Sequence, residues 1–113
     1  MTITETSHGS VVVLSLEGKL MGEPDSTALR ETIYRLADRP VKQVVLDCGG
    51  LKMMNSTGLG TVIAALSSMR KRGGDLRLAH LSEKVYALMT LTHLYKVFKI
   101  YETVERAAAS FHR

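Results

Sequence analysis

Residues 44–60, Val-Val-Leu-Asp-Cys-Gly-Gly-Leu-Lys-Met-Met-Asn-Ser-Thr-Gly-Leu-Gly, decide the predicted fold. The apolar run within residues 43–48 is continuous, which is typical of a short strand covered on both faces. Gly49-Gly50 is expected to end this strand, and a loop is expected to continue to Asn55-Ser56-Thr57. A helix follows, with two hydroxyls and two glycines at its start. In open α/β sheets the carboxyl end of a strand is a common place for a functional surface.

The elements before this stretch predict a hairpin and a helix. Residues 2–7 and 11–17 have strand-like patterns separated by His8-Gly9-Ser10, a turn-like cluster. Residues 18–23 are expected to form a loop. A helix is expected at about 26–38, because Leu29, Ile33 and Leu36 are spaced as on one helical face. Asp25 or Ser26 is the expected N-cap.

The elements after the stretch continue the alternation of helices and strands. The helix that starts near Ser56 should present the apolar positions Leu59, Val62, Ile63, Leu66 and Met69 on one face, with Gly73 as its C-terminal cap. Residues 75–80 and 97–101 are predicted strands. Ser82 and Thr103 are predicted caps of the two remaining helices.

This order of elements predicts an α/β fold. Helices between successive strands imply crossover connections and a mostly parallel sheet, and the opening hairpin makes the sheet mixed. We expect four or five strands and about four helices in a single domain over residues 1–113. A chain of this length supports one hydrophobic core without disulfides or a metal.

Composition and charge exclude several classes of function. The single cysteine, Cys48, excludes an intramolecular disulfide and a cysteine-based metal site. No secretory signal and no membrane-spanning stretch is visible, so the expected location is the cytoplasm, without membrane insertion. The net charge of +4 is scattered apart from residues 70–72, so nucleic-acid binding is not indicated. The four histidines lack the spacing of a metal site, and no catalytic set accompanies Asp47. We therefore expect no cofactor and no enzymatic activity.

The start of the helix after the central strand is the candidate functional site. The hydroxyls of Ser56 and Thr57 can accept hydrogen bonds from the unpaired N–H groups of the first helical turn. Gly58 and Gly60 lack side chains, so either the backbone of a partner or a phosphate can approach there, or the helix can pack tightly. A helix cap without further function is the alternative at this point. A nucleotide-binding P-loop is excluded, because no Gly-Lys-Ser/Thr follows.

The same stretch resembles the STAS family, and within it the antagonists of anti-sigma factors. Members have a short apolar strand ending in Asp, a loop, and then Asp or Asn before Ser/Thr-Ser/Thr-Gly-Leu-Gly. The matching residues are Asp47, Asn55, Ser56, Thr57, Gly58, Leu59 and Gly60. The predicted order of elements also matches the STAS fold over essentially the whole chain.

The resemblance implies a partner-switching mechanism. The second hydroxyl, Thr57, and less readily Ser56, would be phosphorylated by a partner that is both an anti-sigma factor and a serine/threonine kinase. The unphosphorylated chain would bind that partner and free a sigma factor, and a PP2C-type phosphatase would reverse the modification. A second copy of the chain is a further candidate partner. The expected partner-binding residues are Met21, Glu23, Met54, Asn55, Ser56, Thr57, Gly58 and Leu59.

Two positions depart from the family pattern, and two other functions stay open. Asn55 stands where many relatives have Asp, and Met21 stands where relatives often have an acid, which Glu23 is expected to replace in part. Met21, Met53 and Met54 would either form an apolar rim around Thr57 or pack onto the sheet. The main alternative is a STAS domain that is an unswitched scaffold subunit of a signalling or lipid-transport complex. Binding of a small ligand or nucleotide is the third hypothesis.

Overall fold

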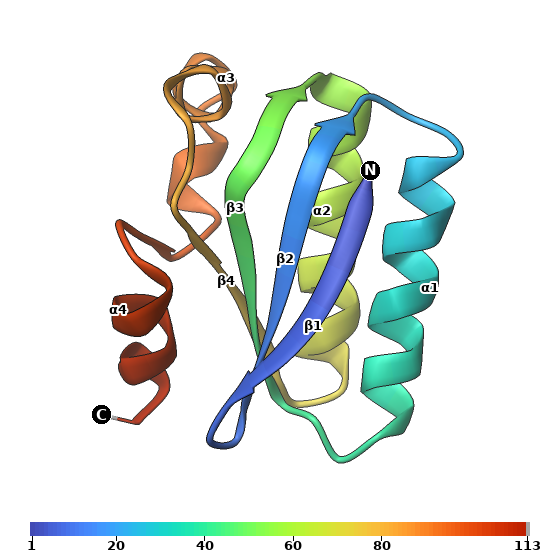
Figure 1. Ribbon diagram of the computed structural model, residues 1–113, viewed down its shortest axis with the longest axis vertical. Helices are drawn as coiled ribbons and strands as arrows, with labels where there is room; N and C mark the ends of the chain where they lie inside the picture. The colour runs from blue at the N-terminus through green and yellow to red at the C-terminus, as the bar shows by residue number, and fades with distance from the viewer. Residues whose placement is uncertain (113) are drawn as a thin grey trace.

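The computed structural model describes residues 1–112 and shows a five-stranded sheet with strand order β1-β2-β3-β4-β5 (Figure 1). Strand β1 is antiparallel to β2, and the other neighbouring strands are parallel. The strands are β1 (Thr2–His8), β2 (Val11–Leu20), β3 (Gln43–Met54), β4 (Asp75–Ala79) and β5 (Ile100–Tyr101), and the α-helices are α1 (Asp25–Asp38), α2 (Ser56–Lys71), α3 (Glu83–Leu91) and α4 (Val104–Ala109). The predicted mixed α/β fold is confirmed.

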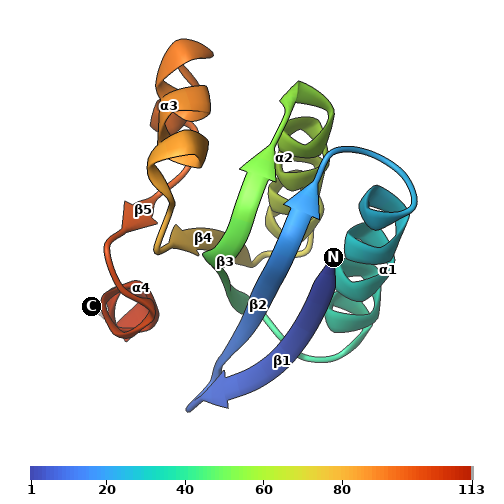
Figure 2. The ribbon, with the colours of Figure 1, turned by 45° about the horizontal axis from the view of Figure 1, so that its top comes forward.

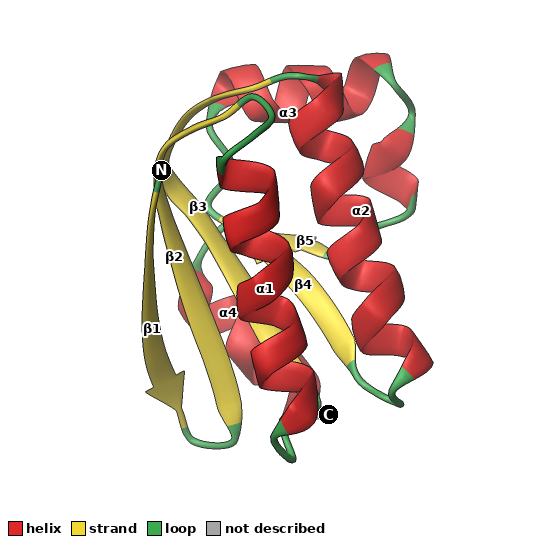
Figure 3. Ribbon diagram, turned by 90° about the vertical axis from the view of Figure 1, so that its right-hand side faces the viewer, coloured by secondary structure: helices red, strands yellow, loops and turns green. Residues whose placement is uncertain are grey.

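Helices cover the two faces of the sheet unequally. Helices α1 and α2 lie side by side on one face, where their apolar sides and alternate residues of β2, β3 and β4 form the main core (Figure 3). The short helix α4 packs on the opposite face. There, Ala107 and Ala108 cover Val11, Val13 and Val45 in a smaller cluster. Because successive strand residues point to opposite faces, each parallel strand contributes to both clusters.

Strand β3 is longer than the sequence indicated. The prediction that Gly49-Gly50 ends it was wrong, since β3 runs to Met54 and β2 runs beside it to Leu20. The register shifts between Ser15 and Glu17 and again between Gly18 and Lys19, so β3 carries one extra residue at each place. Such bulges let a strand pass through glycines and continue its ladder. The extension carries the ends of β2 and β3 past the rest of the sheet.

The opening of α1 also differs from the prediction. The helix begins at Asp25, so neither Asp25 nor Ser26 is its N-cap; Pro24 occupies that position and makes no side-chain cap. The carboxylate of Glu23 instead accepts a hydrogen bond from the backbone N–H of Thr27 at 2.7 Å. The predicted caps Ser82 and Thr103 are confirmed, each accepting from the N–H three residues on.

The segment after α3 corrects the last predicted strand. Residues 97–101 were expected to be extended, but only Ile100–Tyr101 form β5, and Leu94–Lys96 form a 3₁₀ turn, η1. His93, with a φ of 60°, makes the turn between α3 and η1. As a result, α3 stands beyond the carboxyl ends of β4 and β5 (Figure 2). Gly73, with a φ of 81°, ends α2 as expected.

Candidate functional site

The site is formed where the end of β2 meets the start of α2. Because β2 and β3 pair up to Leu20 and Met54, the loop after β2 lies directly beside the α2 N-terminus. A Cβ at Gly22 would lie 3.8 Å from the Cγ2 of Thr57. The loop after β2 and Thr57 are therefore adjacent.

Asn55 joins the loop after β2 to the start of α2. Its side-chain oxygen accepts a hydrogen bond from the N–H of Gly58 at 2.9 Å and thereby caps α2. Its amide nitrogen donates to the carbonyl oxygen of Met21, also at 2.9 Å. An aspartate in this position could cap α2 in the same way, but its carboxylate has no hydrogen to donate to the Met21 carbonyl oxygen. The departure from Asp at this position thus has a structural use in this chain.

The hydroxyls of Ser56 and Thr57 do not cap the helix, which corrects the sequence-based expectation. Both side chains are exposed, and over residues 1–112 neither hydroxyl hydrogen-bonds to another protein group. Asn55 performs the capping, so the two hydroxyls are available to solvent or to a partner. A free hydroxyl at a helix N-terminus can carry a phosphate, because the partial positive charge there stabilises an anionic group.

The two glycines of the first turns have different roles. Gly58 is buried, and a Cβ there would overlap the carbonyl oxygen of Leu20. Its lack of a side chain is therefore explained by tight packing within the chain, one of the two explanations that the sequence left open. Gly60 is exposed, and a Cβ there would have no neighbour within 4 Å among the described residues. Nothing in the domain itself requires glycine at position 60.

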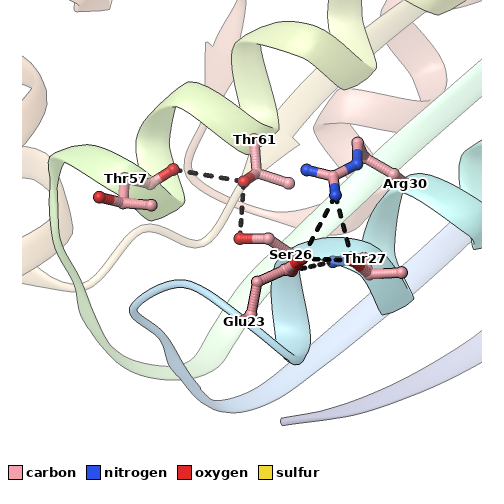
Figure 4. A network of polar contacts seen from close by, with 6 residues as sticks. All are labelled: Glu23, Ser26, Thr27, Arg30, Thr57 and Thr61. Atoms are coloured by element: carbon pink, nitrogen blue, oxygen red, sulfur yellow. Dashed lines mark hydrogen bonds and ion pairs between the residues drawn. The ribbon is translucent and has the colours of Figure 1, made fainter.

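A groove of about 350 Å³ runs between α1 and α2 from Thr57 toward Arg30, with Glu23 and Gly60 along its walls. Figure 4 shows Glu23, Arg30 and Thr57 around it. Ser26 and Thr61, only 3% and 5% exposed, form its base and share a hydrogen bond of 2.8 Å between their hydroxyls. Thr61 also lies 3.2 Å from the carbonyl oxygen of Thr57. This pair links the start of α1 to the turn that carries Thr57.

Glu23 organises the far wall of the groove. Hydrogen bonds from Thr27, and a weaker attraction to Arg30, lower the pKa of the Glu23 carboxyl below its usual value. The Arg30 guanidinium lies 3.5 Å from this carboxylate and 3.1 Å from the Thr27 hydroxyl. Glu23 is largely exposed, so an acidic group stands at the rim near Thr57, as the sequence suggested.

The remaining predicted residues divide between surface and interior. Met21 and Met53 are exposed, whereas Met54 is partly buried and packs on the main core. Leu59 is buried in that core. Met54 thus packs onto the sheet, as the second methionine hypothesis predicted, and an apolar rim around Thr57 stays a prediction for the exposed Met21 and Met53.

Asp47 and Cys48 are not part of the groove beside Thr57. Asp47 accepts a hydrogen bond from the N–H of Gly49 at 3.0 Å and contacts Ser15 and His80 on the α4 side of the sheet. It braces the backbone after it through Gly49, and it is not among the residues that line the groove beside Thr57. Cys48 is buried in the main core, and burial, aided by the nearby Asp47 charge, raises the pKa of its thiol to about 12.

The groove also includes Arg30, Thr61 and Ala64, which the sequence did not indicate, and Ser26, which was expected only as a helix cap. Thr61 stands one helical turn after Thr57, which was a usable signal. The pairing of Thr61 with Ser26 spans 35 residues and has no signature in the sequence.

Two further observations concern metals and membranes. Among residues 1–112, no cluster of three or more His, Cys, Asp or Glu side chains is arranged to hold a metal ion. Over the same residues, the helices are too short or too polar to cross a bilayer.

The fold and this helix start define a STAS domain. The sequence pattern of the STAS domain family matches residues 2–107, and the chain belongs to that family. Its curated relatives include the anti-sigma-B factor antagonist of Bacillus subtilis, which is 30% identical over 88 residues, covering 75% of this chain and 80% of that protein.

Solved structures agree on the fold. An anti-sigma factor antagonist from Mycobacterium paratuberculosis matches with a TM-score of 0.86 at 22% identity, over 99% of this chain and 94% of that chain. The Bacillus cell fate determinant SpoIIAA in its phosphorylated form matches with a TM-score of 0.75 at 18% identity, over 97% of this chain and 99% of that chain.

Proposed function

We propose that this chain is an anti-sigma factor antagonist controlled by phosphorylation of Thr57. In the unphosphorylated state it binds an anti-sigma factor that is also a serine/threonine kinase, and a sigma factor is released. Phosphorylation of Thr57 prevents this binding, and a PP2C-type phosphatase restores it. The observation that carries the proposal is the exposed Thr57 hydroxyl, which makes no hydrogen bond within the described residues although it stands at a capped helix start.

The charge of a phosphate explains why one modification would switch binding without unfolding the domain. A phosphothreonine carries about −1.5 to −2 charges at neutral pH. The partial positive charge at the start of α2 favours that charge within the domain. A partner surface built against a neutral hydroxyl must instead desolvate it. A hundredfold loss of affinity corresponds to about 2.7 kcal/mol, which such a penalty can supply.

Gly60 supports a partner surface next to Thr57. Glycine inside a helix costs up to about 1 kcal/mol relative to alanine. Since no atom of the described residues occupies the space of a Cβ at position 60, that cost has no internal explanation. Close approach of a partner over the first turns of α2 accounts for it. The same surface includes Met21 and Glu23 from the facing loop.

The test compares wild type, Thr57→Ala and Thr57→Glu as baits in pull-downs from cells of the source, analysed by mass spectrometry. We expect wild type and Thr57→Ala to capture a small ATP-binding kinase and Thr57→Glu to capture at least about tenfold less. Ser56→Glu is the matched control, since it adds the same charge at the neighbouring exposed hydroxyl. Circular dichroism should show that all four proteins are folded.

Two outcomes contradict the proposal. Equal capture of one kinase by wild type and Thr57→Glu would remove the switch. Capture of the same large sensory or transport assembly by both baits would instead make the domain a scaffold subunit. Gly60→Ala gives an independent check, because it should weaken kinase capture while the fold remains at least as stable as wild type.

A further inference from the structure

A second and larger cavity lies away from Thr57, at the carboxyl ends of β4 and β5. It has a volume of about 630 Å³ and is lined by residues of α3, η1, β5 and the segments that flank them; Figure 2 shows α3 and β5. This volume is within the range of about 300–1,000 Å³ that is usual for small-molecule sites. The carboxyl ends of parallel strands are also where α/β proteins place their ligands. The proposed switch uses no residue of this cavity.

Aromatic side chains are concentrated in the cavity lining. The chain has four tyrosines and two phenylalanines. Four of these six residues line the cavity: Tyr86, Tyr95, Phe98 and Tyr101. Phe98 is buried in the main core, whereas Tyr86 from α3 is 51% exposed at the mouth. The cavity thus combines an apolar base with ring faces and hydroxyls that a flat molecule can contact.

His80 lines the cavity and links β4 to β5. His80 has a φ of 60°, a left-handed conformation that is uncommon for a residue with a side chain. Its N–H donates to the carbonyl oxygen of Tyr101 at 3.1 Å, which ties the two sides together. Its ring occupies the space in front of Gly49, where a Cβ would overlap it, and its Nδ1 lies 3.6 Å from Asp47. Residues held in such conformations are enriched at ligand sites.

The charges around the cavity favour a cation. Glu102 is the one acidic or basic side chain other than His80 in the lining, and no lysine or arginine is part of it. A neighbouring cavity of about 300 Å³ shares His80 and Glu102 and adds Asp47 and Glu105. Glu102 is paired with Arg106 at 3.6 Å, but both are largely exposed, so this pair is weak.

One ring of the lining already attracts a cation. The ammonium group of Lys96 lies 5.9 Å from the centroid of the Tyr95 ring, within cation–π distance. A positive group on a ligand would find the same kind of attraction from the other rings, together with the Glu102 carboxylate. An anionic group would find the Glu102 carboxylate and no lysine or arginine in the lining.

We propose that this cavity binds a small molecule that combines a flat aromatic ring with a cationic amine. The ring lies among Tyr86, Tyr95 and Tyr101 over Phe98, and the amine is directed toward Glu102. The chain would thus carry a ligand site in addition to its proposed partner-binding surface.

Tryptamine is the test probe, with indole and indole-3-acetate as matched molecules that carry the same ring with no charge and with a negative charge. Binding is followed by chemical-shift changes in the ¹⁵N-labelled chain, including the amides of His80 and Tyr101. For a probe of this size we expect a Kd of about 1 mM or tighter. Tryptamine should bind at least about threefold more tightly than indole, and indole-3-acetate should bind most weakly.

Four substitutions test whether tryptamine binds in this cavity and not elsewhere on the molecule. Glu102→Gln should weaken tryptamine binding by about threefold or more and leave indole binding unchanged. Tyr86→Ala should weaken both. Tyr34→Ala is the control, because Tyr34 lies on α1 outside this lining and is 50% exposed, nearly the same as Tyr86. Thr57→Glu should bind tryptamine like wild type, which keeps this result independent of the switch.

The proposal is overturned if tryptamine produces no saturable shifts at this site up to about ten times the expected Kd. It is also overturned if indole-3-acetate binds as tightly as tryptamine, or if Tyr34→Ala and Tyr86→Ala have equal effects.

Discussion

Asn55 carries two hydrogen bonds that together shape the candidate site. One caps α2 through Gly58, and the other holds the Met21 carbonyl of the facing loop. Because a single amide supplies both, the position of the loop after β2 and the start of α2 depend on one side chain. The hydroxyls of Ser56 and Thr57 are therefore not needed to cap α2.

Replacing Asn55 by alanine should remove both bonds. We expect the free energy of unfolding to fall by about 1–2 kcal/mol, the usual cost of losing an N-cap of this type. Urea denaturation followed by circular dichroism measures the change. Ser56→Ala is the control, and its effect should stay within about 0.5 kcal/mol because the hydroxyl makes no hydrogen bond in the described residues. A larger effect for Ser56→Ala than for Asn55→Ala would contradict this assignment of the cap.

The start of α2 packs directly against the backbone at the end of β2. Gly58 makes this contact possible, whereas Gly60, half a turn further, faces open space. The two glycines therefore offer a matched pair of substitutions in one helix.

Gly58→Ala should destabilise the domain by about 1–3 kcal/mol, because the new methyl group must displace the Leu20 backbone. Gly60→Ala should instead raise stability by up to about 1 kcal/mol through improved helix propensity. Thermal and urea unfolding of both variants would measure the difference. Equal effects of the two substitutions would show that α2 does not pack on β2 in this way.

The arrangement of elements was predictable where it depends on periodicity, and less so where it depends on pairing. Apolar spacing was enough to predict α1 to α4 and the mixed sheet. The extension of β3 through Gly49 and Gly50 was missed, because bulges depend on the neighbouring strand β2. The groove base formed by Ser26 and Thr61 was missed for a related reason, since the tertiary structure alone brings those two hydroxyls together.

The buried thiol of Cys48 makes the free energy of unfolding of the whole domain depend on pH in the alkaline range. Its ordinary pKa of 9.0 is raised to about 12 in the folded chain. Below pH 9 the thiol is protonated in both states, so its contribution to stability is complete. Above pH 9 the unfolded chain ionises first, and stability is lost as the pH rises toward 12.

The free energy of unfolding of wild type should therefore fall by about 2 kcal/mol more than that of Cys48→Ala between pH 7 and pH 10.5. Comparing the two proteins removes the contribution of lysines and tyrosines that titrate in the same range. Parallel pH profiles for both would contradict a buried thiol.

The unequal covering of the sheet has a further consequence. The valines Val11, Val13 and Val45 are shielded by Ala107 and Ala108 of α4, a helix of six residues close to the end of the described chain. Proteolytic removal of that helix would expose a continuous β-branched surface on a sheet whose first strand is already an open edge. Such surfaces recruit further chains into aggregates. Intact α4 therefore prevents self-association through this face of the sheet. Limited digestion near Thr103 should convert the protein into an insoluble form.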